Sequence, residues 1–89
     1  MVRMMVVFEV HLAPGADPAD LLTAETLRET GAQVMTPEDF RKVGFGGLPE
    51  APAGTVVRLI AVAKRDAGWV QRALETNDAA GTFRAFDVD

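Results

Sequence analysis

Two residues near the start of this chain have the types and spacing that acid–base chemistry requires. Glu9 and His11 stand two positions apart in an alternating apolar segment, so a strand there places both side chains on one face. A carboxylate beside an imidazole can serve as an acid/base pair. Arg58 and Arg84 lie in two later apolar segments, and their guanidinium groups suit an anionic substrate. The alternative is a salt-bridge ladder that faces solvent or another subunit.

A second set of candidate residues combines positive charge with consecutive glycines. Its members are Arg41, Lys42, Gly44, Phe45, Gly46 and Gly47. Successive glycines let backbone N–H groups converge on an anion, so a phosphate-bearing ligand would find donors and positive charge together. No helix start follows in the manner of a nucleotide-binding loop. A plain flexible connection, whose glycines permit tight turns, is therefore the alternative.

The composition removes several classes of function. The chain has no cysteine, serine or tyrosine and a single histidine, which excludes thiolate metal sites and serine or cysteine nucleophiles. We predict no metal and no cofactor. The net charge of −4 argues against a nucleic-acid partner. The first apolar run is too short for a membrane span or a signal peptide, so we expect a cytoplasmic protein without a membrane partner.

The positions of capping residues, glycines and prolines predict one domain, residues 1–89, with six main elements. In order they are a strand at 4–12, a helix from Asp17 to Gly31, a strand at 32–35, a strand at 55–64, a helix from Asp66 to Asn77 and a strand at 82–88. Alternating apolar residues mark the first strand, and an Asp-Pro pair marks the first helix start. Residues 36–54 form a long connection with one predicted helical turn around Phe40.

This β-α-β-β-α-β order predicts an α+β, ferredoxin-like sandwich, in which a four-stranded antiparallel sheet carries both helices on one face. That arrangement places the first strand between the third and the fourth. We therefore expect Arg58 and Arg84 to flank Glu9 on the uncovered face of the sheet. A chain of 89 residues buries a modest share of its surface, so we also expect a homo-oligomer, a dimer or a trimer.

Two short segments resemble the nitrogen-regulatory PII-like proteins, and the element order is more loosely similar to that of ACT domains. Val43-Gly44-Phe45-Gly46 resembles the glycine–phenylalanine–glycine step at the base of the PII-like T-loop, and residues 81–88 are similar to that family's glycine-led last strand. The resemblance implies a trimer that binds adenine nucleotides or another small effector between subunits. It also implies that Gly44, Gly46 and Gly47 approach a phosphate.

Three functions fit these patterns. The first is an oligomeric ligand sensor or adaptor, of the PII-like signalling type, whose loop at 36–54 responds to a small anionic effector or a protein partner. The second is a dimeric α/β-barrel enzyme, similar to an isomerase or a cyclase, with Glu9, His11, Arg58 and Arg84 as catalytic residues. The third is a structural accessory subunit. We predict the first, under which the chain is not an enzyme, and leave the enzyme as the alternative.

Overall fold

One antiparallel sheet organises the chain in a computed structural model, which describes residues 4–43 and 51–88. The strands are β1 (Met5–His11), β2 (Gln33–Met35), β3 (Val57–Ala63) and β4 (Thr82–Val88). The helices are α1 (Ala24–Thr30), α2 (Pro37–Lys42) and α3 (Ala67–Glu75). The strand order is β2-β3-β1-β4, and each neighbouring pair is antiparallel.

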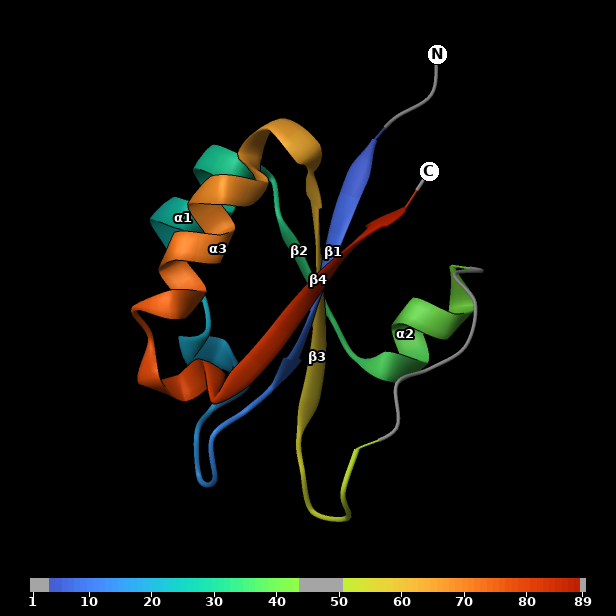
Figure 1. The fold of residues 1–89 in the computed structure, drawn as a ribbon, viewed down its shortest axis with the longest axis vertical. Coiled ribbons are helices and arrows are strands. Elements are labelled where there is room, and N and C mark those ends of the chain that lie inside the picture. Colours follow the sequence, from blue (N-terminus) through green and yellow to red (C-terminus); the bar gives the residue numbers. More distant parts are fainter. Residues whose placement is uncertain (1–3, 44–50, 89) are drawn as a thin grey trace.

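The ferredoxin-like arrangement predicted from the element order is confirmed. Helices α1 and α3 lie together on one face of the sheet, and β1 runs between β3 and β4 (Figure 1). Helix α2 lies on the opposite side of the sheet (Figure 1). The sheet is therefore covered from both sides, in part by a helix that belongs to the connection between β2 and β3.

The face beneath α1 and α3 carries the larger apolar core. Its buried members include every second residue of β1, as the alternation predicts: Val6, Phe8, Val10, Leu12, Leu21, Leu22, Ala32, Ile60, Val62, Val70, Leu74 and Ala80. The Phe8 ring also meets Phe83 of β4 in a tilted arrangement, with 6.1 Å between ring centroids. Burial of these side chains supplies the main stabilisation of the fold.

The first helix begins later than the sequence predicts. Asp17 does cap a helical turn, and its carboxylate accepts a hydrogen bond from the Ala19 N–H, but the turn is a 3-10 segment, Pro18–Asp20. The α-helix starts after Thr23, whose hydroxyl oxygen accepts from the Thr26 N–H at 3.1 Å. It ends, as expected, at Gly31 with a left-handed backbone, φ +68°.

The other face of the sheet is not open along its whole width. Phe40 of α2 is 2% exposed and packs with Val7, Leu59 and Ala61, of which Val7 and Leu59 are fully buried. The Thr-Pro sequence starts α2 as predicted, because the Thr36 hydroxyl oxygen accepts from the Asp39 N–H. The expectation of an uncovered face is therefore wrong over β3 and the Met35 end of β2, and holds for the part of the face near β4.

No helix within the described parts of the chain combines the length and apolar character needed to cross a membrane.

Candidate functional site

The candidate site lies on the second face of the sheet, at the middle of β1. Glu9 is directly opposite Leu59 of β3 on one side and Arg84 of β4 on the other. Residues directly opposite in antiparallel strands share a face, so the central strand presents Glu9 among side chains from both neighbours. Only 6% of the Glu9 side chain is exposed. A buried carboxylate requires partners for its oxygens, and the structure provides them.

Each carboxylate oxygen of Glu9 has its own partner. Oε1 accepts from Arg84 Nε at 3.0 Å and lies 2.9 Å from Arg84 Nη2. Oε2 lies 2.8 Å from His11 Nε2. Ionised partners make such hydrogen bonds short and strong. The prediction that Glu9, His11 and Arg84 share one face and come together agrees with this geometry.

The contact with Glu9 determines which nitrogen of His11 carries a proton. An ionised carboxylate only accepts hydrogen bonds, so Nε2 of His11 is the donor in the 2.8 Å contact. Within residues 4–43 and 51–88, Nδ1 has no hydrogen-bond partner. About a quarter of the side chain is exposed, 24%. In the neutral imidazole Nδ1 therefore offers a lone pair, while Glu9 holds the ring in place.

A glycine supports the strand end that carries His11. Gly81, just before β4, has φ +57°, and a Cβ placed there would lie 2.5 Å from the His11 carbonyl oxygen and 2.9 Å from the Ala13 nitrogen. Any side chain at this position would push the two backbones apart. Thr82 then pairs directly with His11. Gly81 thus allows β4 to start close enough to place Arg84 beside Glu9.

Arg58 does not belong to this cluster, so the expectation that it flanks Glu9 is wrong. It pairs with Val10, which faces α1 and α3, and the residue of β3 opposite Glu9 is Leu59. The Arg58 guanidinium Nη1 donates to the Val57 carbonyl oxygen at 2.9 Å. The reason is the register of β3, which places Arg58 on the opposite face from Glu9.

The second predicted set is only partly visible. Arg41 and Lys42 lie in the last turn of α2 and are exposed. Gly44, Phe45, Gly46 and Gly47 lie outside the described residues. A phosphate site at these glycines, and the resemblance to the PII-like loop base, therefore remain predictions.

Three residues near the site were not predicted to belong to it from the sequence. Leu59 lies opposite Glu9 on β3, and Phe40 covers the neighbouring part of the face. Gly81 allows the backbone before β4 to approach the end of β1 closely. A glycine that ends a predicted helical region looks like an ordinary stop signal. Its contact with the His11 backbone becomes visible only when β1 and β4 are paired.

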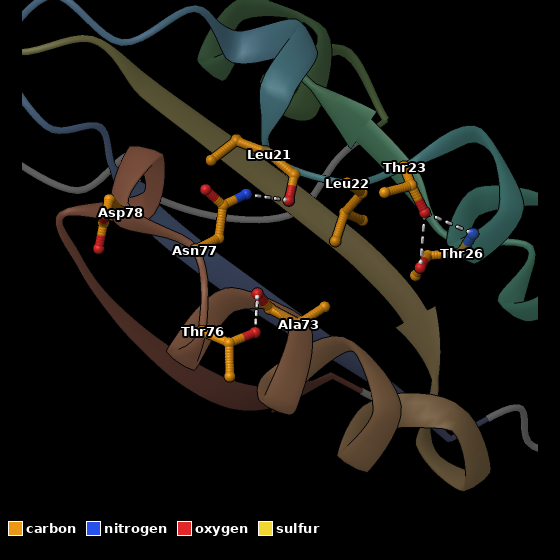
Figure 2. A pocket seen from close by; sticks show the side chains of 8 residues that line it. All are labelled: Leu21, Leu22, Thr23, Thr26, Ala73, Thr76, Asn77 and Asp78. Atoms are coloured by element: carbon orange, nitrogen blue, oxygen red, sulfur yellow. Dashed lines mark hydrogen bonds between the residues drawn. The ribbon is translucent and has the colours of Figure 1, made fainter.

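A hollow of about 460 Å³ lies elsewhere, between the start of α1 and the end of α3 (Figure 2). Asn77 joins the two sides, because its Nδ2 donates to the carbonyl oxygens of Asp20 at 2.7 Å and Leu21 at 3.0 Å. The Thr76 hydroxyl donates to helix carbonyl oxygens of α3. The Asn77 amide and the Thr76 hydroxyl therefore already donate within the protein.

No protein-family model matches this chain, and neither a curated protein nor a solved structure does. The geometry of the Glu9, His11 and Arg84 cluster is therefore the basis for inferring a function.

Proposed function

We propose that the chain binds a small organic anion beside β1 and β4 and that His11 takes a proton from it. The observation that carries this proposal is the divided use of the Glu9 carboxylate. One oxygen contacts Arg84 and the other contacts His11 Nε2, while Nδ1 is unpartnered within residues 4–43 and 51–88. A carboxylate that orients an imidazole in this way favours proton transfer at the other ring nitrogen.

Each residue has a separate task in this proposal. His11 Nδ1 accepts a proton from a C–H or O–H group next to a carbonyl, and the ring becomes an imidazolium. Glu9 stabilises that charge across the existing 2.8 Å contact. Arg84 keeps Glu9 in place, and because its side chain is 72% exposed, its guanidinium also attracts the anionic group of the ligand. Return of the proton to a different atom completes an isomerisation, without a metal or a redox cofactor.

The experiment is solvent deuterium exchange. Small oxo acids, which are anions with C–H groups next to a carbonyl, are incubated with the protein in D₂O, and the loss of C–H signals is followed by NMR. We expect exchange with the natural protein and a rate about 100-fold lower for His11→Gln, since general bases contribute about 10²–10⁴-fold. Arg58→Gln is the matched control, because Arg58 faces α1 and α3 and its loss leaves the cluster intact. Equal rates for His11→Gln and the natural protein would contradict the proposal.

Ligand sensing at the connection after β2 is the second proposed function. It is supported by the two exposed cations, Arg41 and Lys42, at the end of α2, which precede the glycine-rich segment of the sequence. Thermal-shift measurements with nucleotides and small phosphorylated metabolites test it. We expect a stabilising ligand whose effect falls in the Arg41→Gln, Lys42→Gln double variant and persists in His11→Gln. A ligand effect lost with His11→Gln and kept in the double variant would place binding at the sheet instead.

A further inference from the structure

The two edges of the sheet differ in length and protection. At one edge, β2 has three residues, Gln33–Met35, and leads directly into α2. At the other edge, β4 has seven residues, Thr82–Val88, paired along its whole length with β1 and with no partner on its outer side among the described residues. Proteins usually shorten, bend or cover such an edge, because its free backbone groups invite another strand.

The pairing pattern shows which backbone groups of β4 point outward. The Lys64 N–H donates to the Met4 carbonyl and the Leu12 N–H donates to the Val56 carbonyl, so even-numbered residues of β1 bond toward β3. Bonding direction alternates along an antiparallel strand. The odd-numbered residues of β1 therefore bond toward β4, where they meet residues 82, 84, 86 and 88. The N–H and C=O groups of Phe83, Ala85 and Asp87 consequently face away from the sheet.

The side chains of β4 allow a close neighbour. The strand contains no proline or glycine, and its register with β1 is unbroken, so no bulge turns the edge away. It carries one positive charge, Arg84, and one negative charge, Asp87, so two copies of it do not repel each other. Phe86 is 38% exposed, an aromatic surface at the edge that gains from being covered.

We propose that a second copy of this chain pairs with β4, antiparallel, across a two-fold axis at Ala85, and so joins the two sheets. Only a two-fold axis perpendicular to the sheet relates adjacent antiparallel copies, and it pairs residues that face the same side. Centring it on Ala85 places Ala85 opposite its own copy and Phe83 opposite Asp87. In this register all seven residues find partners, and every outward N–H and C=O group is satisfied.

The same register affects the candidate site. Arg84 would lie directly opposite Phe86 of the second copy, on the face that carries Glu9. A guanidinium held by Glu9 at 2.9 Å would rest beside an aromatic ring, a favourable cation–π arrangement that occurs twice by symmetry. If the second copy were shifted by two residues along β4, Arg84 of one copy could lie opposite Arg84 of the other. The two like charges would then repel, so this register is less favourable.

Cysteine cross-linking tests both the interface and its register, because the chain has no cysteine of its own. In the proposed dimer two Ala85→Cys residues face each other with Cα atoms about 5.5 Å apart, within reach of a disulfide. Thr82→Cys residues would be separated by about six residues, roughly 20 Å. Val34→Cys, on the β2 edge and 37% exposed, measures random collision. We expect rapid oxidation to a dimer for Ala85→Cys alone.

The mass in solution, measured by light scattering, provides the second readout. We expect the natural protein to have twice the chain mass of 9.5 kDa. The Ala85→Pro variant should have the mass of one chain, because it lacks an outward N–H that the proposed interface uses and that β1 does not use. A monomeric natural protein, Thr82→Cys cross-linking as fast as Ala85→Cys, or a dimeric Ala85→Pro variant would each overturn the proposal. Mass and cross-linking do not depend on proton transfer by His11, so the two proposals fail separately.

Discussion

The two faces of the sheet use the same strands for different purposes. The face under α1 and α3 is a continuous apolar core in which Phe8, Val10 and Ile60 are essentially inaccessible. The opposite face divides into two parts. Phe40 of α2 closes an apolar part over β3, while the part near β4 contains a buried carboxylate with two polar partners.

That difference shows where this fold places polar chemistry. A buried charge costs free energy unless it is hydrogen-bonded, and Glu9 is bonded through both oxygens. All buried side-chain nitrogen and oxygen atoms of the described residues are satisfied. The second face can therefore hold an ionised group without an unpaired polar atom. One partner of that group, the Arg84 side chain, remains 72% exposed to solvent.

The largest effect should come from truncating the aromatic ring on either side of the sheet. Phe8→Ala, at 1% exposure, should lower the free energy of unfolding by about 3–5 kcal/mol. Phe40→Ala, at 2% exposure, should lower it by about 3 kcal/mol. Urea unfolding measures both. Val43→Ala, at the end of α2 and 57% exposed, is the control with little effect. A cost under about 1 kcal/mol for Phe40→Ala would mean that α2 is not a structural layer.

Gly81→Ala tests a position that acts on both faces, since a side chain there would move the strand ends themselves. The new Cβ would lie 2.5 Å from the His11 carbonyl oxygen, at a φ of +57°, so we expect a loss of about 3 kcal/mol from strain and strand displacement. Gly54→Ala is the matched control, because its φ is +86° and nothing lies within 4 Å. It should lose about 1 kcal/mol. Similar losses for both variants would show that the close approach to His11 is not important.

The sequence predicts β1 well because its apolar and polar residues alternate. In β1, the apolar residues Val6, Phe8 and Val10 separate cleanly from Glu9 and His11, and a period of two leaves no choice of face. Arg84 was correctly expected beside Glu9, because β4 begins at a fixed turn and pairs with β1 over its full length.

Arg58 could not be placed from the sequence, for a physical reason. Strand β3 is apolar on both faces, and Leu59, Ile60, Ala61 and Val62 are all buried, so its pattern does not distinguish the faces. Its register then depends on the connection before it, and a slip of one residue exchanges the faces. For the same reason the covering of the second face by Phe40 was not predicted.

The first helix start illustrates a different limit. Asp17 and Thr23 both form side-chain caps in the structure, and either is a good cap sequence. Which of them begins the α-helix depends on tertiary packing, because Leu21 and Leu22 between them are buried in the core. Local preference alone cannot decide between two adequate caps.

The ion pair of the second face should respond unequally to the loss of its two members. Arg84→Leu leaves the Glu9 carboxylate, 6% exposed, with His11 as its remaining partner, and should cost about 1–3 kcal/mol. Glu9→Leu removes the buried charge, places an apolar side chain next to Leu59, and should change stability by less than about 1 kcal/mol. Urea unfolding of both variants measures the difference. A loss above about 3 kcal/mol for Glu9→Leu would show that the carboxylate is needed for folding, which would weaken the proposal that its role is to orient His11.

The smallest effect should come from the exposed ion pair at the margin of the other face. Lys64 Nζ lies 4.0 Å from Asp87 Oδ2, and the two side chains are 51% and 64% exposed. Lys64→Gln should therefore lower stability by less than about 0.5 kcal/mol, because solvent screens such a pair. The ion pair between Arg84 and Glu9 has one buried partner, so it should contribute several-fold more to the free energy of unfolding. Thermal unfolding at low and high salt distinguishes the two pairs, since added salt should remove the Lys64→Gln effect and leave most of the Arg84→Leu effect. Equal salt sensitivity would contradict the contrast between the two faces.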